Sequence, residues 1–408
     1  MLREYLDLPR SVHILCAGMF INRAGSFVMV FLTIYVTEQL GFEKTFAAQC
    51  MGMFGLGAIA ASLIGGQLAD QIGRKVVMLT AMFGGAILLL VLSAAESRTG
   101  VLLTIFAYSL IAETFRPACS AMMGDLTEPS QRPASFGLYY ICINLGFACG
   151  PPIGGILADI SYKFLFWGDA LTMAAFGLII GCFVPESQAA VSDNTPTPDD
   201  VPVAVAVKRI LSDGPFVLFC LATFLLSLVF MQSVATLPIF IKDAGYSNAE
   251  FGVFMAINGL LIFLVQLPLT HFLERFNAMS NIVFGGVLIG VGFGMYYWPV
   301  TSILLVAAVL VWTVGEMMQA PFKQTVVTNL APPELRARYL GLFSMSHSLA
   351  LTIGAPIGGF ILSHHGSQTL WSLCFIVSVA GTITYAATYR TVSSRSELLL
   401  ATQEQTQG

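Results

Sequence analysis

Charged residues are scarce in this sequence, and their scarcity excludes an ordinary water-soluble domain. Asp, Glu, Lys and Arg together make up 10% of the 408 residues, whereas hydrophobic residues make up 56% and the mean hydropathy is +0.79. Apolar runs of about 18 residues or more can cross the roughly 30 Å hydrocarbon layer of a bilayer as helices. The sequence therefore predicts a multi-pass membrane protein surrounded by lipid.

The signatures of common enzymes are also lacking. The sequence contains no G-x-x-x-x-G-K-[ST] phosphate loop, no Ser/His/Asp spacing of a hydrolase and no cluster of metal ligands. The eight cysteines lie in apolar segments without a C-x-x-C pair, which is typical of small buried side chains. The net charge of −4 is small and says nothing about nucleic acid, and we expect no nucleic-acid partner. We expect no enzyme activity, no direct use of ATP, no cofactor and no bound metal.

What the sequence does contain is a series of twelve apolar segments. They lie near residues 12–37, 46–69, 75–94, 99–123, 134–158, 164–184, 214–241, 249–272, 279–298, 301–329, 337–362 and 369–390. The first segment carries Asn22 and Arg23 in its middle, so we expect a spanning helix there and no cleavable signal peptide. Residues 185–213 include a stretch rich in Pro, Ser and Asp, which predicts a flexible linker. The predicted domains are a six-helix bundle over 1–184, this linker, and a second six-helix bundle over 214–408.

Lys and Arg are distributed unevenly between the two sides of these segments. One side receives Lys44, Arg98, Lys163 and Lys242. The side of the N-terminus receives Arg3, Arg10, Arg74, Lys75, Arg132, Lys208, Arg209, Arg275, Arg336, Arg338, Arg390 and Arg395. Since positively charged loops favour the cytoplasmic side, we expect both termini and the linker to be cytoplasmic, in the inner (cytoplasmic) membrane of a cell.

The two halves of the chain match one another at an offset of 204 residues. The block 150–155 (GPPIGG) corresponds to 354–359 (GAPIGG), Pro117 corresponds to Pro321, and Asp70 corresponds to Glu274. Apolar composition alone would not align Gly, Pro and a loop acid at one offset. Duplicated six-helix halves around a site near the bilayer midplane are the plan of many secondary transporters.

Two motifs are typical of one transporter family. The loop 66–75 (GQLADQIGRK) sets Gly66, Asp70, Gly73, Arg74 and Lys75 between two apolar segments, and the fifth segment contains Gly146 followed by GPPIGG at 150–155. Together with the six-plus-six layout, these motifs resemble the 12-helix drug:proton antiporter branch of the major facilitator superfamily. The resemblance implies an all-α integral membrane fold of two pseudo-symmetric six-helix bundles.

The resemblance also implies roles for the motif residues. Asp70 and Arg74 would form a charge cluster with Asp125, and this cluster would act as a conformational latch; the alternative is a loop that only sets the topology. The fifth-segment motif consists of Gly146, Gly150, Pro151, Gly154 and Gly155, and in the family it is associated with export. The alternative is that these residues only allow the helix to pack closely and to bend, with no bearing on the direction of transport. The first, fourth, seventh and tenth spans would line a central cavity.

Five charged residues lie inside predicted spans and away from the segment ends: Arg23, Glu113, Arg116, Glu316 and Lys323. A charge at mid-bilayer costs at least ~2.5 kcal/mol, so such residues usually face a cavity or a partner. In one interpretation Glu113 and Glu316 bind protons in competition with substrate, and Arg23 tunes the first of them. In the other, Glu113 and Arg116 form a permanent neutral pair, and Lys323 extends toward the cytoplasmic surface.

Weaker candidates for lining the substrate path are Asn22, Tyr139, Asn144, Asn258 and Gln232, each of which could equally make hydrogen bonds between helices. Asp169, near the external end of the sixth segment, receives no role here.

The sequence predicts a proton-coupled secondary transporter that works by alternating access, takes its energy from the proton gradient, and exports amphipathic, drug-like molecules. We expect its partners to be a small-molecule substrate, protons and the lipid bilayer, and we expect a monomer. One alternative is a transporter of an anionic metabolite, peptide-like compound or siderophore, with the buried cations as ligands. A more distant alternative is an enzyme or receptor built on a transporter scaffold.

Overall fold

The computed structural model describes residues 5–128, 131–187, 203–332 and 335–407, and within these ranges the chain is helical and contains no strand. Eleven of the described helices are long and apolar enough to cross a membrane. The last, Arg338–Val392, is 55 residues long, and its backbone leaves helical geometry at Gly366 (φ 80°, ψ 170°). Because each part of this helix is long enough to cross, the prediction of twelve spans in an all-α membrane protein is confirmed.

The helices form two compact units. Unit 1 contains Met1–Ser192, Val234–Phe263 and Ala355–Ser363, and unit 2 contains Asp193–Ser233, Leu264–Gly354 and His364–Gly408. Two segments of the second half of the chain therefore belong to the unit that holds the first half. The domain boundaries expected from the sequence stay a prediction, and most of the expected linker (188–202) lies outside the described residues.

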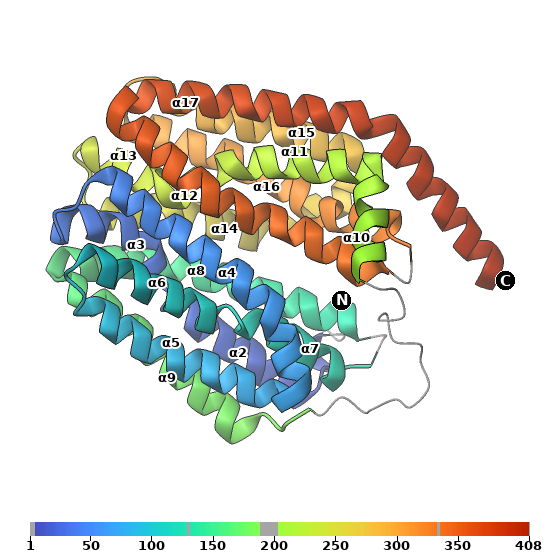
Figure 1. The fold of residues 1–408 in the computed structure, drawn as a ribbon, viewed down its shortest axis with the longest axis horizontal. Coiled ribbons are helices and arrows are strands. Elements are labelled where there is room, and N and C mark those ends of the chain that lie inside the picture. Colours follow the sequence, from blue (N-terminus) through green and yellow to red (C-terminus); the bar gives the residue numbers. More distant parts are fainter. Residues whose placement is uncertain (1–4, 129–130, 188–202, 333–334, 408) are drawn as a thin grey trace. The chain divides into compact units, whose positions relative to one another are not determined.

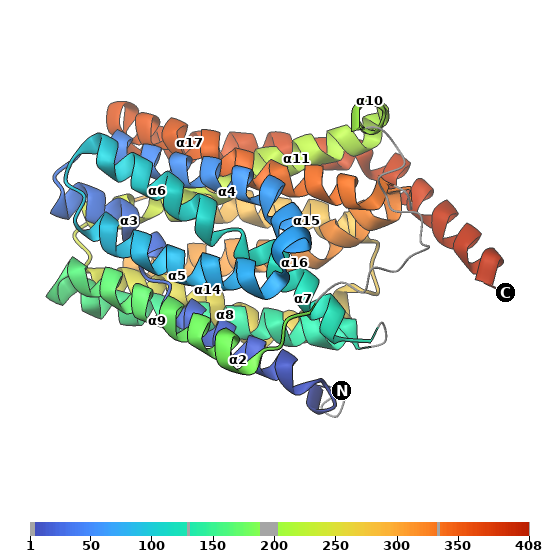
Figure 2. The ribbon, with the colours of Figure 1, turned by 60° about the horizontal axis from the view of Figure 1, so that its bottom comes forward.

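Unit 1 is built mainly from the first six spans. Its helices are α2 (Arg10–Ala24), α3 (Val28–Ile34), η1 (a π-helical turn, Tyr35–Gln39), α4 (Lys44–Ile72), α5 (Arg74–Ser93), α6 (Arg98–Ala112), α7 (Phe115–Leu126), α8 (Arg132–Ile160), α9 (Tyr162–Phe183), α13 (Leu237–Asp243) and the first part of α14 (Asn248–Leu273). Figure 1 shows α4, α5, α6 and α9 running side by side. Helix α2 packs against α8 and α9, and Figure 2 shows it close to α9.

Unit 2 holds most of the second half. Its helices are α10 (Val203–Ser212), α11 (Gly214–Phe230), the rest of α14, α15 (Ala278–Gly294), η3 (a 3₁₀ turn, Met295–Tyr297), α16 (Ser302–Leu330) and most of α17 (Arg336–Gln407), while α12 (Gln232–Ala235) lies at the division. Its core contains fully buried aromatic rings. Trp312 donates a hydrogen bond from Nε1 to the Tyr296 hydroxyl (3.2 Å), and Tyr296 packs on Trp371 with 5.1 Å between ring centroids.

Three of the spans are broken, although the sequence predicted them as continuous segments. The first is interrupted between Ala24 and Val28, the fourth at Glu113 and Thr114, and the seventh at Met231 and Thr236. Discontinuous helices are tolerated at membrane depth only where other groups satisfy the freed backbone. All eight cysteines are free; Cys182 is exposed, contrary to the expectation that all would be buried.

Candidate functional site

Arg23 lies in the last turn of α2, directly before the break in the first span. Helix α8 passes close to it, since a Cβ atom at Gly146 would lie 2.6 Å from the Arg23 Cβ. The Arg23 Nε atom is buried and makes no hydrogen bond to any described residue. Its positive charge acts on the Asp169 carboxylate of α9 and on the hydroxyls of two tyrosines, the buried Tyr108 and the partly buried Tyr139.

Asp169 is a functional candidate to which the sequence analysis assigned no role. Its side chain is buried, with the residue only 1% exposed, and its Oδ2 accepts a hydrogen bond from the Val28 backbone N–H (3.1 Å). Val28 is the first residue of α3, so this carboxylate bonds the backbone just after the break. The signal available in the sequence was an acid inside an apolar segment, which by itself does not show its partner.

Glu113 and Arg116 lie where the fourth span is broken. Arg116 Nε and Glu113 Oε2 are 2.8 Å apart, and the Glu113 side chain is 17% exposed while that of Arg116 is 64% exposed. The charge of Glu113 also acts on Tyr108 of α6, which in turn interacts with Arg23 and Asp169. Arg23, Glu113 and Asp169 therefore all act on Tyr108, and the pairing of Arg23 with Glu113 in proton coupling stays a prediction.

Unit 2 contains a second polar cluster around α16. Lys323 is 7% exposed, its Nζ lies 5.5 Å from the centroid of the Tyr385 ring, and the charge of Glu316 acts on it. The Tyr385 hydroxyl is 2.7 Å from Thr223 Oγ1. His347 Nδ1 hydrogen-bonds with Ser227 Oγ at 2.8 Å. Lys323 is therefore buried among polar and aromatic groups, and its extension to the cytoplasmic surface is not what the structure describes.

The loop motif forms an ion-pair cluster. Arg74 NH2 lies 3.0 Å from Asp70 Oδ1, and Arg74 Nε lies 3.1 Å from Asp125 Oδ2. Arg74 is buried and Asp70 is largely exposed, so the arginine anchors the cluster. Lys75 points elsewhere and donates from Nζ to the Gly181 carbonyl (2.8 Å). Gly73 adopts φ 100°, which only glycine takes readily, whereas a Cβ at Gly66 would meet open space.

The glycines of the fifth-segment motif lie where α8 touches its neighbours. Added Cβ atoms at Gly146 and Gly150 would clash with the backbone of α2, at 2.9 Å from the Phe20 oxygen and 3.0 Å from the Arg23 oxygen. A Cβ at Gly155 would lie 2.4 Å from the Asn248 carbonyl oxygen at the start of α14.

Gly154 and Pro151 complete the motif's packing. A Cβ at Gly154 would meet the rings of Phe27 and Phe31, and the Pro151 carbonyl oxygen lies against Gly252 of α14. The motif therefore forms two close helix seams, α8 with α2 and α8 with α14.

The weaker candidates make mostly short-range contacts. Asn144 donates to the Tyr140 carbonyl (2.9 Å), Gln232 donates to the Leu228 and Gly354 carbonyls (3.0 and 2.9 Å), and the Asn22 amide lies 3.9 Å from the Met82 sulfur. Asn258 is buried at 7% exposure, and Tyr139 is linked to Cys119 and Arg23. For Gln232 the bond to Gly354 joins two helices of unit 2.

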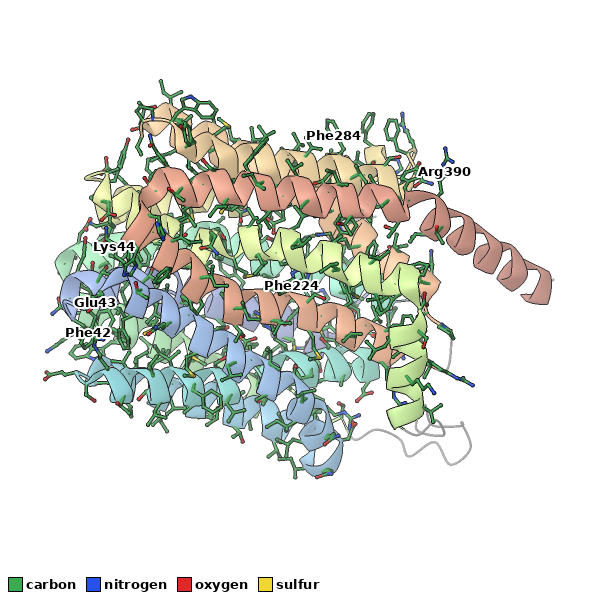
Figure 3. All side chains as sticks on the ribbon, turned by 45° about the horizontal axis from the view of Figure 1, so that its top comes forward. Phe42, Glu43, Lys44, Phe224, Phe284 and Arg390 are labelled. Carbon is green, nitrogen blue, oxygen red and sulfur yellow. The ribbon has the colours of Figure 1, made fainter. Side chains whose placement is uncertain are left out.

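A further network, which the sequence did not suggest, lies at the end of unit 1 where α4 begins. Here Lys242 pairs with Glu38 (3.3 Å), Lys44 pairs with Asp243, and Tyr162 donates to Glu38 (2.6 Å). Figure 3 shows Lys44 beside Phe42 and Glu43 at this end. We call this set, together with Asp159 and Asn248, the rim network.

Asp159 and Asn248 join the rim network to helix α14. The Asp159 carboxylate accepts from the first two backbone N–H groups of α14, at Asn248 and Ala249 (3.1 Å each), and the Asn248 amide donates to the Tyr162 hydroxyl (3.2 Å). An anion there also interacts favourably with the helix dipole. These contacts join residues 80 or more positions apart in the chain, which is why no local pattern revealed them.

The geometry agrees with comparisons to known proteins. The family model of the Major Facilitator Superfamily matches residues 15–350 and 304–406. The chain is 29% identical over 390 residues to the MFS-type transporter YttB of Bacillus subtilis (strain 168), covering 93% of this chain and 96% of that protein. It is 27% identical over 383 residues to a Na(+), Li(+), K(+)/H(+) antiporter of Planococcus maritimus, covering 86% and 89%.

More distant similarities extend this picture. The multidrug resistance protein MdtH of Photorhabdus laumondii subsp. laumondii is 22% identical over 376 residues, covering 90% of this chain and 91% of that protein. The crystal structure of the nucleoside transporter NupG superposes with a TM-score of 0.77 at 16% identity, covering 93% of this chain and 99% of that one. At this identity the superposition shows a shared fold.

Proposed function

Because this chain belongs to the Major Facilitator Superfamily, we propose that it is a proton-coupled secondary transporter that exports amphipathic, drug-like small molecules by alternating access. The observation that carries the proposal is an acid beside a cation within the spanning helices of each half. Asp169 and Glu113 lie near Arg23 in the first half, and Glu316 acts on Lys323 in the second.

Such pairs suit proton exchange. An ionised carboxylate inside a membrane is favourable only while a cation compensates its charge. Displacement of that cation, or arrival of a substrate, therefore changes how strongly the acid holds a proton. The P. maritimus relative is named as an antiporter that exchanges protons, and MdtH is named as a multidrug resistance protein. The energy source would be the proton gradient, with no cofactor.

The motif residues take supporting roles in this proposal. The Asp70–Arg74–Asp125 cluster would act as a conformational latch, and the small residues of α8 would allow close packing in one state of the cycle. We further propose an inner-membrane location with cytoplasmic termini, and a monomer as the working unit.

A second candidate function is exchange of a monovalent cation for protons, which the name of the P. maritimus relative favours. The anionic alternative has less support, since Arg116 is paired with Glu113 and Arg23 faces Asp169. The solved nucleoside transporter bears on the fold alone.

One proteoliposome assay distinguishes these candidates. Purified protein is reconstituted in vesicles that contain a pH-sensitive dye and have an acidic lumen, and ethidium, NaCl, KCl or sodium succinate is added outside. Drug:proton antiport predicts that ethidium accumulates and the lumen becomes alkaline, and that Glu316→Gln abolishes both. Cation:proton antiport predicts the same response to NaCl or KCl, and the anionic alternative predicts movement of succinate.

The matched control is Glu250→Gln, which removes an exposed acid bonded to Ser247 at the start of α14. It should retain the wild-type response. The proposed export function is wrong if the wild-type protein accumulates none of a panel of amphipathic compounds under this gradient.

A further inference from the structure

Asp169 is the only buried acid among the residues that the structure describes, and the proposed function names it beside Arg23 without giving it a role of its own. It lies seven residues from the start of α9, so it is about 10 Å along that helix, within the spanning segment. An isolated ionised carboxylate at such a place would cost several kcal/mol. Its surroundings must therefore compensate the charge or leave the group protonated.

The backbone around Asp169 is arranged about the break in the first span. Its Oδ2 accepts from Val28 N–H, which has no partner within α2 because the helix ends at Ala24. One turn further along α9, Thr172 lies against Gly25: a Cβ at Gly25 would be 2.1 Å from Thr172 Oγ1. The position of the break and the position of this carboxylate are thus fixed together.

The charged and titratable groups around Asp169 come from several helices. Arg23 of α2 is the cation that acts on it, and Tyr108 of α6 interacts with it through a buried hydroxyl. The other charged residues of α9 and of the helices packed on it lie at helix ends: Arg10 on α2, Arg74 and Lys75 on α5, Arg132 and Asp159 on α8, Lys163 on α9, and Glu38 after α3. Arg23 is therefore the principal counter-charge.

Arg23 has a second acid within its cluster. Glu113 interacts with Tyr108, as Arg23 does, and Glu113 already has an ion pair with Arg116. Glu113 therefore belongs to the same set of interacting groups as Arg23, and its present ion-pair partner, Arg116, is largely exposed.

We propose that Asp169 is a coupling residue that binds and releases a proton during transport. When Asp169 takes a proton, it becomes neutral and Arg23 turns toward Glu113. When Asp169 gives the proton up, Arg23 returns to it and the Val28 N–H bond is strengthened. Because Asp169 is sealed in this conformation, the proton exchanges with water only after α3 moves relative to α9, which links protonation to a conformational step.

This inference rests on the proton coupling proposed above, and its rival is a carboxylate that only caps α3. The substitution Asp169→Asn separates the two, because an amide oxygen still accepts from Val28 N–H but carries no charge and binds no proton. Asp159→Asn is the matched control, since it changes a second carboxylate that also accepts backbone N–H groups at the start of a helix.

The experiment measures ethidium accumulation in proteoliposomes as a function of pH, together with the melting temperature in detergent. We expect Asp169→Asn to melt within a few degrees of the wild-type protein, yet to lose its pH dependence and at least about tenfold of its gradient-driven accumulation. Asp159→Asn should keep the wild-type pH profile. An Asp169→Asn protein with the wild-type profile would overturn the inference while leaving proton-coupled export intact.

Two further outcomes also decide whether Asp169 is a coupling residue. If Asp169→Asn does not fold, Arg23→Gln takes its place: removal of the counter-charge should move the pH midpoint upward, and an unmoved midpoint would overturn the inference. If the wild-type protein itself shows no gradient-driven accumulation of any compound, the proposed function and this inference fail together.

Discussion

The seam between α8 and α14 gives a prediction that depends on backbone geometry alone. Gly252 of α14 faces Pro151 of α8, and a Cβ at this position would lie 2.2 Å from the Pro151 carbonyl oxygen and 2.8 Å from its carbon. Ordinary contact begins at 3.4 Å, so the helices would have to separate locally by about 1.2 Å in Gly252→Ala. Neither partner is the end of a flexible side chain that could move away.

Two neighbouring contacts show that the seam is tight along its length. A Cβ at Gly155 would lie 2.4 Å from the Asn248 carbonyl oxygen, and one at Gly259 would lie 2.6 Å from the Ala148 nitrogen. Overpacking of a close-packed site costs about 1–3 kcal/mol. Applied to one of two conformations, that cost changes their ratio roughly 5- to 150-fold. Gly252→Ala should therefore depopulate the conformation in which α8 and α14 are packed.

The assay uses double electron–electron resonance to measure the distribution of distances between nitroxide labels at Lys163 and Glu250, two exposed positions of unit 1. The exposed Cys182 is replaced so that it is not labelled. In Gly252→Ala the short-distance population should fall and a longer one should grow. The control is Gly181→Ala on α9, whose Cβ would meet only Leu79 at 3.7 Å. Gly181→Ala gains the same helix propensity as Gly252→Ala but introduces no clash.

An unchanged distribution in Gly252→Ala would refute the reasoning, because the seam would then be loose enough to admit a methyl group. An equal change in Gly181→Ala would refute it as well, since helix propensity and not packing would be the cause.

Two further predictions concern single positions in loops and turns. Arg74→Lys keeps the charge but loses the guanidinium that spans Asp70 and Asp125, so the protein should lose about 1–2 kcal/mol of stability in thermal unfolding. Asp70→Asn removes only an exposed partner of Arg74 and should cost less than about 1 kcal/mol. Gly366→Ala should lower the free energy of unfolding by about 1–2 kcal/mol because Gly366 has a φ of 80°; crowding plays no part, since a Cβ there would meet nothing within 4 Å. Gly366→Asn should recover part of the loss, because asparagine tolerates this conformation better than alanine. Equal stability of the wild-type protein and both variants would contradict this prediction.

The sequence was sufficient for the number of spans, because span length and hydropathy depend on the bilayer and hardly on neighbouring helices. It was not sufficient for the breaks. Helix breakers do stand at these places, since Pro117 follows Glu113 by four residues and cannot donate to its carbonyl, and Gly25 lies in the first break. Proline also occurs inside unbroken helices such as α8, and the first break lies where Asp169, 141 residues away, bonds Val28. Which of the breakers interrupts a span therefore depends on tertiary contacts as well.

The same distinction applies to the candidate site. Glu113 and Arg116 are three residues apart, so the spacing alone placed them on one helical face, and the structure pairs them. The electrostatic interaction of Arg23 with Asp169 joins α2 to α9 and required coordinates. Likewise, their spacing within the tenth apolar segment placed Glu316 and Lys323 on one helix, but the Tyr385 ring beside Lys323 comes from another.

Helix α4 connects the two charged regions of unit 1. Lys44, the first residue of α4, pairs with Asp243, and Asp70, in its last turn, pairs with Arg74. The helical rise over the 26 steps from Lys44 to Asp70 places these two residues about 39 Å apart. The helix contains no proline and is unbroken over 29 residues. A rigid helix of this kind that tilts about its middle moves its two ends in opposite directions. A tilt of α4 would therefore displace the rim network and the Asp70–Arg74–Asp125 cluster more than the middle of the helix, so these two regions are the parts of unit 1 most sensitive to a movement of α4.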